Sequence, residues 1–241
     1  VENKGGASGN LAYQQVARAP KDGHTLLVSY SGYHVANPIL MSKLPWELKD
    51  LTPVGLITVA TNVVAVHPSV PVNNMKEFIA YVKQNPGKLN YASQGNGSVS
   101  HIGTEIFKQQ TGVNLVHVPY RGAQAAYQDL LGGRVDLFFD LSSTARVQVN
   151  AGTVKALAVS GAERNPMHPD VSTILESGVA QLDLESWFGY FVPKKTPADV
   201  QERLRSELAK VIAQTDLQDN FRKAGCKTAG TGRNDQNRRY V

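Results

Sequence analysis

Leu89-Asn90-Tyr91-Ala92-Ser93 predicts a short β-strand, and Gln94-Gly95-Asn96-Gly97-Ser98 follows it as a small polar loop. Val99–Gln110 comes next and carries apolar side chains at helical spacing. A strand that passes through a short loop into a helix points several backbone N–H groups at one spot, at the positive end of the helix dipole. This junction suits an anion, a carboxylate in particular, and needs no catalytic side chain.

The same order of strand, loop and helix start returns at Ser29–His34, Tyr120–Ala123 and Asp140–Ser143. Strands and helices alternate throughout, which predicts an α/β fold with mostly parallel sheets. The other predicted strands are Thr25–Ser29, Pro53–Val59, Asn62–His67, Asn114–Tyr120, Val135–Asp140, Lys155–Ser160 and Trp187–Pro193. The other predicted helices are Asn10–Ala19, Asn37–Ser42, a helix from Asn73 or Asn74 to Gln84, Ala123–Leu131, Ser143–Asn150, Val171–Ser177 and a long helix that begins near Pro197.

Two of the predicted strands mark a division of the chain into lobes. Asn62–His67 and Trp187–Val192 are each followed by a proline and then by a helix. If they lie side by side, residues 1–67 with 187–241 form one lobe and residues 68–186 form the other. Two crossing strands would join these lobes. A ligand would then bind between them at the carboxyl ends of the strands, and the lobes would close on it by a hinge.

Composition excludes several classes of protein. The chain has 241 residues, of which 41% are hydrophobic and 19% charged, as in ordinary globular proteins. No apolar stretch approaches the roughly 18 residues of a membrane helix. The net charge of +5 comes from scattered basic residues mixed with acids, which argues against nucleic-acid binding.

Cysteine and histidine usage narrows the chemistry further. Cys226 is the single cysteine, so an internal disulfide is impossible, and we expect it to have a packing role. The histidines show no metal-ligand spacing. We therefore expect no metal, no cofactor and a monomeric protein.

Two other functions remain open at this stage. Catalytic motifs such as G-x-S-x-G, a phosphate-binding loop and H-E-x-x-H do not occur. The cluster of Ser98, Ser100 and His101 leaves a hydrolase that uses Ser98 and His101 as the weaker alternative. A ligand-sensing module that signals to a partner is the other, because one fold serves both roles.

Seven motifs occur in an order that resembles a known family. They are Lys4–Asn10, Pro20–Leu27, Leu89–Ser93 with Gly95–Ser98, His117–Gly122, Asp129–Gly133, Lys155–Val159 and Ser186–Gly189. Together they closely resemble the tripartite tricarboxylate transporter substrate-binding family, also called the Bug family. The resemblance covers nearly the whole chain up to about Gly230.

The resemblance implies a function as well as a fold. The family consists of periplasmic binding proteins with a type II two-lobe fold. The ligand would be a small carboxylate: a dicarboxylate, a tricarboxylate, an acidic amino acid or an aromatic acid. Backbone amides of strand-to-helix loops, assisted by waters, would hold it, and the protein would deliver it to a membrane permease.

Ligand-binding positions carry over from the family residue by residue. The expected set is Ser29, Ser31, Gly32 and Tyr33 in the first lobe, and Ser93, Gly95, Asn96, Gly97, Ser98, His101, Gly122, Ala123 and Asp140 in the second. His101 is equally open to a packing role. Asp140 would accept a hydrogen bond from the ligand or from a water, or alternatively cap the helix that begins near Ser143.

The sequence departs from the family pattern at three places. The family begins with a strand, a Gly-rich loop and a helix, and Val1–Lys4 already belongs to the segment after that unit. Gly5 stands where the family has proline, and Asn234–Val241 stops where a last helix should finish. We therefore expect the chain as printed to bind ligand weakly or not at all unless the first unit is supplied.

Overall fold

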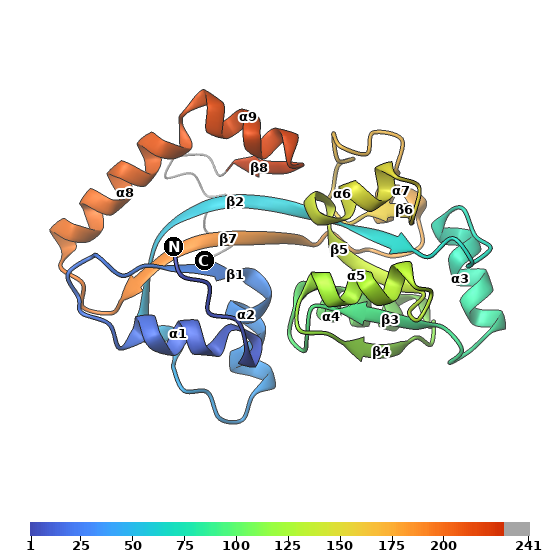
Figure 1. Ribbon diagram of the computed structural model, residues 1–241, viewed down its shortest axis with the longest axis horizontal. Helices are drawn as coiled ribbons and strands as arrows, with labels where there is room; N and C mark the ends of the chain where they lie inside the picture. Colours follow the sequence, from blue (N-terminus) through green and yellow to red (C-terminus); the bar gives the residue numbers. More distant parts are fainter. Residues whose placement is uncertain (229–241) are drawn as a thin grey trace. The chain divides into compact units, whose positions relative to one another are not determined.

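The computed structural model describes residues 1–228 and shows an α/β fold, as the alternating pattern predicts (Figure 1). Its contacts divide the chain into two compact units: unit 1, Val1–Val59 with the chain from Trp187 onward, and unit 2, Ala60–Ser186. The strands are β1 (Leu27–Tyr30), β2 (Leu51–Val66), β3 (Asn90–Ser93), β4 (Val116–Pro119), β5 (Leu137–Leu141), β6 (Lys155–Val159), β7 (Glu185–Pro193) and β8 (Cys226–Thr228). The helices are α1 (Asn10–Ala17), α2 (Ser31–Leu40), α3 (Met75–Gln84), α4 (Val99–Thr111), α5 (Ala123–Leu131), α6 (Ser142–Asn150), α7 (Ile174–Ser177), α8 (Ala198–Ile212) and α9 (Thr215–Lys223), with 3₁₀ turns at Ala7–Gly9 and Leu48–Asp50.

Two long strands carry the chain from one unit to the other. β2 has 16 residues and β7 has 9, and each contains a boundary between the units. The sequence predicted two strands, Pro53–Val59 and Asn62–His67, where β2 is continuous. Ala60 and Thr61 between them are buried and contain no turn-forming residue, so the extended backbone passes straight through. The lobe boundary at His67 stays a prediction.

Unit 2 contains a sheet with three parallel strands. β3 lies between β4 and β5 and is parallel to both, with Tyr91 opposite His117 on one side and Leu137 on the other. β2 continues the sheet antiparallel to β5, and β6 pairs antiparallel with β2. The prediction of mostly parallel sheets was therefore wrong, because β2 crosses between the units and runs against β5 and β6. β3, β4 and β5 are parallel, and the next element of the chain after each is a helix. The helices α4, α5 and α6 therefore all begin at the same edge of the sheet.

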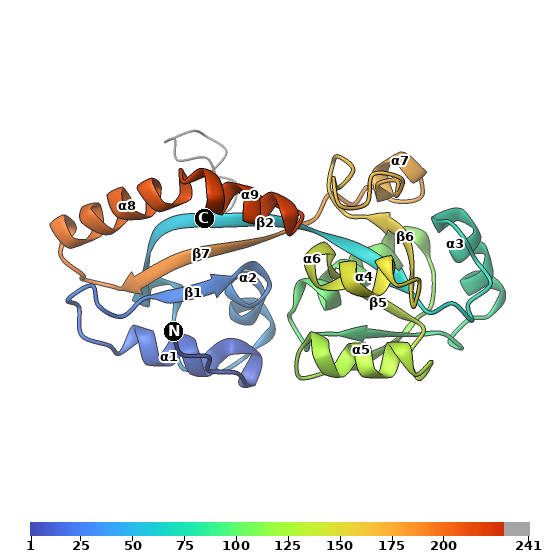
Figure 2. The same cartoon turned by 45° about the horizontal axis from the view of Figure 1, so that its top comes forward.

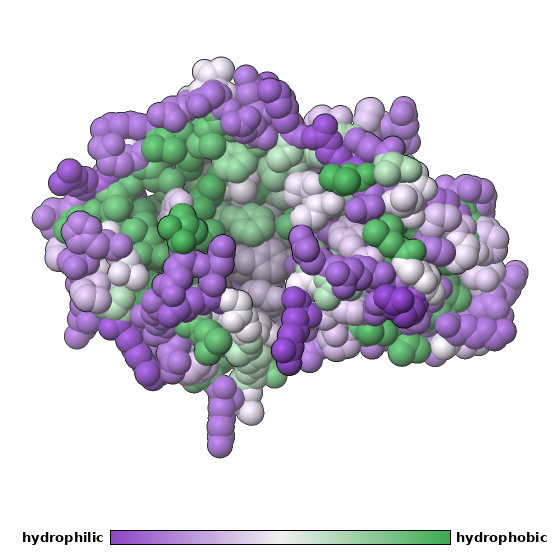
Figure 3. Space-filling view, in the orientation of Figure 1, coloured by the Kyte–Doolittle hydropathy of each residue, from purple (hydrophilic) through white to green (hydrophobic). Residues whose placement is uncertain are grey.

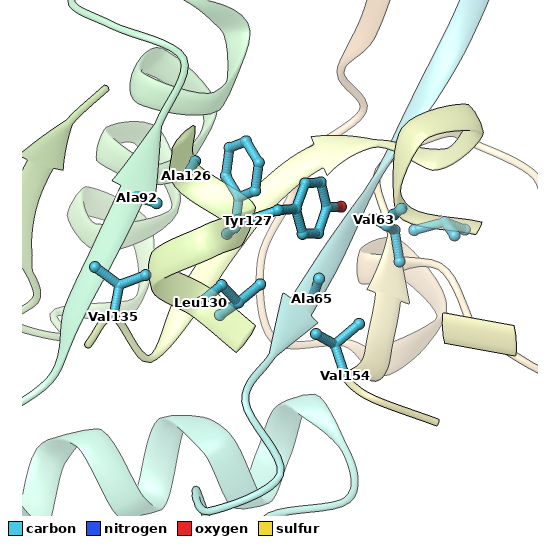
Figure 4. Close-up of a cluster of buried hydrophobic side chains, with 11 residues drawn as sticks. Val63, Ala65, Ala92, Ala126, Tyr127, Leu130, Val135 and Val154 are labelled. Atoms are coloured by element: carbon cyan, nitrogen blue, oxygen red, sulfur yellow. The ribbon is translucent and has the colours of Figure 1, made fainter. Parts of the chain in front are cut away.

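The core of unit 2 explains why α5 is held against this sheet. Ala126 and Leu130 of α5 are fully buried and pack in one cluster with Val63 and Ala65 of β2 and with Ala92 of β3 (Figure 4). These residues have i, i+4 spacing on the helix and alternate along β2, so each element presents one apolar face. Burial of the shared apolar surface fixes the position of the helix start.

Unit 1 is built around β1, which pairs antiparallel with β7 from Leu27 opposite Phe191 to Tyr30 opposite Phe188. Its core joins Tyr13, Leu27, Trp46 and Trp187, among others. Helices α8 and α9 lie on one side of these strands and α1 on the other (Figures 1 and 2).

Close packing and amphipathic character together place α8. A Cβ atom on Gly55 of β2 would lie 2.6 Å from the Cδ2 atom of Leu208 of α8, so a larger residue here would require the Leu208 side chain to move. On the face drawn in Figure 3, apolar residues gather over unit 1 below the polar outer surface of α8 and α9. The helix therefore presents its apolar side to the strands and its polar side to solvent.

The start of α2 was predicted wrongly, and α7 begins at Ile174, three residues after its predicted start. The sequence predicted a helix over Asn37–Ser42, with Pro38 in its first turn, whereas α2 begins at Ser31 directly after β1 and contains Pro38 in its last turn. Asn37 is not a cap, because its side chain donates to the carbonyl of Ser8 and to Oδ1 of Asn10. The early start makes Tyr30–Ser31 a strand-to-helix junction, as expected for Ser29–His34.

Within residues 1–228, no helix is both long and apolar enough to cross a membrane. The predictions for Asn234–Val241 lie outside the described residues.

Candidate functional site

The starts of α4, α5 and α6 bring nine of the predicted ligand residues to one edge of the unit 2 sheet. β3 supplies Ser93 at the centre of this edge, and β5 supplies Asp140 beside it. The loops before α4 and α5 supply the glycines. The parallel strand order, more than any single residue, therefore assembles this part of the site.

The loop before α4 satisfies much of its own backbone. The amide N–H of Gly95 donates to Ser93 Oγ at 3.2 Å, and that of Gly97 donates to His101 Nδ1 at 3.2 Å. The Gln94 N–H donates to Ser100 Oγ at 3.0 Å, and the Ser98 N–H donates to the carbonyl of Gly95 at 3.2 Å. From the sequence we expected the amides of this loop to donate to an anion. In this structure, four of them already donate to acceptors within residues 93–101.

Ser98 is the N-cap of α4. Its Oγ accepts from the backbone N–H of His101 and donates to the carbonyl of Gly95 at 2.7 Å. The residue is fully buried. Its hydroxyl therefore has a structural role at the helix start, as expected for serine at this position.

These bonds do not support the hydrolase that uses Ser98 and His101. A nucleophilic serine must donate its proton to the histidine ring. Here the Ser98 hydroxyl donates to a carbonyl, and His101 Nδ1 accepts from the Gly97 amide. A Ser–His contact does exist between Ser93 Oγ and His117 Nε2, at 2.7 Å, but Ser93 is fully buried and inaccessible to a substrate.

Three rings stack beside the loop. The His101 and His117 rings lie 4.3 Å apart at 17°, and His117 lies 4.8 Å from Tyr91 at 18°. Burial lowers the pKa of His117 to about 4, and it also lowers the pKa of His101. Both imidazoles are therefore neutral at pH 7. Since His101 Nδ1 accepts a hydrogen bond, its proton resides on Nε2, and the ring can offer a neutral N–H donor.

Asp140 is fully buried at the end of β5. Its Oδ1 accepts from Gln94 Nε2 at 2.6 Å, and its Oδ2 accepts from the Thr144 hydroxyl in the first turn of α6. Burial raises the pKa of this carboxyl, and the hydrogen bonds from Thr144 and Gln94 oppose that rise. The predicted capping role was wrong, because the N-cap of α6 is Leu141 and no side chain caps this helix; Asp140 contacts its first turn through the Thr144 hydroxyl instead. A contact with the ligand stays a prediction.

The starts of α5 and α6 differ from that of α4. The N-cap residues are Gly122 and Leu141, and neither helix has a hydrogen bond from a capping side chain. The first N–H groups of a helix have no partner within the helix. With Gly122 at φ 104° and ψ 172°, the α5 start uses a backbone conformation that essentially only glycine adopts. No capping side chain therefore occupies the first N–H groups of these two helices.

Unit 1 contains the other four predicted ligand residues, at the junction of β1 and α2. Ser29 Oγ is 2.6 Å from the Tyr13 hydroxyl, and Ser31 Oγ accepts a hydrogen bond from the backbone N–H of Trp187 at 3.2 Å. Both serines are buried, so their side chains bind within the unit. Gly32 and Tyr33 lie in the first turn of α2, which also has no side-chain cap.

Sequence reasoning missed several polar residues of the unit 2 edge. Gln94 and Thr144 bind Asp140, and Ser100 and His117 bind the loop and Ser93. Their partners lie on other strands or in the next turn, and no local spacing marks such contacts. In the described part of the chain, no group of three or more histidine, cysteine, aspartate or glutamate residues could hold a metal ion.

Two α/β units linked by two strands, with helix starts gathered at the carboxyl ends of three parallel strands in a mixed sheet, define the fold of the type II periplasmic solute-binding proteins. Comparison with known sequences is more specific. The family model described as "Tripartite tricarboxylate transporter family receptor" matches residues 1–241, and the chain belongs to this family.

Relatives support this placement. The UPF0065 protein in the tcbD-tcbE intergenic region of Pseudomonas sp. (strain P51) is 36% identical over 232 residues, which are 95% of this chain and 69% of that protein. The structure of R. palustris Rpa4515 with adipate has a TM-score of 0.93 at 32% identity, covering 99% of this chain and 80% of that one. MatC (Rpa3494) from Rhodopseudomonas palustris with bound malate has a TM-score of 0.86 at 32% identity, covering 96% and 78%. The chain spans about two thirds of the length of its curated relatives.

Proposed function

We propose that this protein is a solute receptor that binds a small carboxylic acid. The observation that carries the proposal is the edge of the unit 2 sheet, where three helices begin and two of them have no side-chain cap. Backbone N–H groups at helix starts can donate hydrogen bonds to a carboxylate, so no cationic side chain is required to bind it. Of the thirteen residues named from the sequence, Gly122 and Ala123 are the most favoured for ligand contact, and the buried Ser29, Ser31, Ser93 and Ser98 support the site through their hydroxyls.

The acids bound by related proteins guide the choice of ligand. Two of the relatives with solved structures hold adipate and malate, a plain and a hydroxylated dicarboxylate. We therefore place dicarboxylates ahead of tricarboxylates, acidic amino acids and aromatic acids. Neutral His101, with its N–H donor at Nε2, is suited to a carboxylate or hydroxyl oxygen of such a ligand.

The cellular role follows from the family. We propose that the protein acts in the periplasm, without catalysing a reaction, and delivers its ligand to the membrane permease of a tripartite transporter. Because the chain spans about two thirds of its curated relatives, the permease and the transport step belong to the proposal for the whole protein. A pull-down that recovers a sensor kinase in place of a permease would favour the signalling alternative.

A thermal-shift screen tests the binding claim. The panel contains succinate, malate, adipate, citrate, aspartate, glutamate, nicotinate and benzoate. A ligand at 100 times its Kd stabilises the folded state by about 2.7 kcal/mol. For a chain of this size that corresponds to a rise of roughly 5–10 °C in Tm. A rise confined to one class of acid supports the proposal and identifies the class, whereas equal small shifts with every acid and with chloride would indicate an ionic-strength effect.

A further inference from the structure

We propose that Asp140 is a positioning residue: its buried carboxylate ties the loop before α4 to the first turn of α6 and so sets the spacing of the helix starts. The consequence for binding rests on the proposed receptor function. The positioning itself rests on contacts within unit 2 alone.

The hydrogen bonds to Asp140 from Gln94 and Thr144 connect three separate elements, and Tyr127 of α5 also interacts with this carboxylate. The residue lies on β5, opposite Val63 of β2. Gln94, whose Nε2 donates to Oδ1, is the first residue after β3, and Thr144, whose hydroxyl donates to Oδ2, is in α6. One side chain thus holds together the end of β5, the loop that leads to α4 and the start of α6.

Gln94 is fixed from its backbone as well as from its side chain. Its N–H donates to Ser100 Oγ, and Ser100 Oγ lies 2.8 Å from the hydroxyl of the N-cap residue Ser98. The hydrogen bond to Asp140 therefore acts on a residue that is already attached to α4. Displacement of the Gln94 side chain would loosen the connection between the α4 start and the rest of the edge.

The burial of Asp140 argues against direct contact with a ligand. None of its surface is exposed, and each carboxylate oxygen already accepts a hydrogen bond from a side chain of the same unit. Loss of either donor would leave one oxygen of a buried carboxylate without a hydrogen bond, which is energetically costly. Both Gln94 and Thr144 are therefore needed to keep this carboxylate buried. The residue that the sequence named as a ligand contact is thus better explained as the support of the site.

Four variants separate positioning from contact: D140A, D140N, Q94M and T144V. In D140N, the asparagine oxygen can still accept a hydrogen bond from Gln94. The asparagine NH₂ group can donate to Thr144 Oγ1, because the Thr144 hydroxyl can donate to the Leu141 carbonyl at 2.9 Å. T153V is the matched control, because Thr153 binds Gln148 near the far end of α6.

Hydrogen exchange of the ligand-free chain is the first readout. We expect the amides of residues 94–98 to exchange about tenfold faster in D140A and Q94M, because the hydrogen bond that fixes Gln94 is lost. D140N and T153V should exchange like the wild type. Unchanged exchange in both D140A and Q94M would overturn the proposal. If D140A does not fold, Q94M carries the same test, because it removes the same hydrogen bond to Gln94.

The second readout is the Kd for succinate and for malate, which differ by one hydroxyl. Positioning predicts that D140A and Q94M weaken both acids by the same factor, roughly tenfold, and that the double variant is no weaker than either single variant. Weakening of malate with unchanged succinate would show direct contact and contradict the proposal. If the wild type binds neither acid, the receptor function fails for these probes, while the exchange experiment still decides the positioning role.

Discussion

Ser93 shows how one hydroxyl can support several parts of the site at once. Its Oγ accepts from the Gly95 amide and lies 2.7 Å from His117 Nε2, and the residue is fully buried. S93A leaves both partners without their bond, so we expect the free energy of unfolding to fall by about 1–3 kcal/mol in urea denaturation. The control is S69A, because Ser69 makes a similar bond to His67 on the surface. A loss for S93A no larger than the few tenths expected for S69A would contradict this role.

His117 makes stability depend on pH. Its pKa is about 4 in the folded protein, whereas an unperturbed histidine has a pKa of 6.5. Between these values the unfolded chain binds a proton that the folded chain does not bind, so the free energy of unfolding falls as pH drops from about 6.5 to about 4. Because the ring is only half-buried, we expect roughly 1 kcal/mol from this residue after allowance for solvent screening.

The measurement compares the wild type with H117Q, in which the glutamine amide can take the place of Nε2. Subtracting the two free energies of unfolding removes the contribution of the carboxylates and of His34. Burial lowers the pKa of His34 to about 4 as well. The difference between the two proteins should be constant above pH 7 and change only below about pH 6.5. A difference that does not vary with pH would show that His117 has no such coupling.

At the scale of the element, the start of α5 offers a direct test of the helix-start mechanism. Gly122 has a positive φ and no atoms near the position of a Cβ, so G122A strains the backbone without a clash. G152A is the matched control, because Gly152 at the end of α6 also combines a positive φ with open space. Each variant should lose about 1–2 kcal/mol of stability. Only G122A should raise the Kd of the bound acid, by roughly tenfold, in calorimetric titration. Equal effects of the two variants on Kd would mean that the α5 start does not bind the ligand.

Elements with a strong local signal could be predicted from the sequence. Strand, polar loop and apolar periodicity follow one another at Leu89–Gln110, and β3 and α4 lie there. The start of α2 could not be predicted, because Pro38 usually belongs to a first helical turn and here is in the last. Side-chain partners such as Asp140 and Gln94, which are 46 residues apart, depend on which strands are neighbours, and no local pattern contains that information.

At the scale of the whole molecule, the alternating pattern and the ordered motifs led to the right fold class and family. The lobe boundary and hinge closure on the ligand stay predictions from the sequence. Each unit has its own core, and in each unit a helix without a side-chain cap follows a strand, namely α2 after β1 in unit 1 and α5 and α6 after β4 and β5 in unit 2. A receptor that recognises a carboxylate through backbone amides needs no charged residue at fixed positions, so the ligand cannot be named from side chains.

The central claim is that this protein binds a small carboxylic acid, and isothermal titration calorimetry tests it most directly. Succinate, malate and adipate are titrated into the protein. We predict saturable binding of at least one dicarboxylate at one site per chain. Absence of saturable binding of these acids and of the rest of the thermal-shift panel, to a protein shown to unfold cooperatively, would contradict the claim.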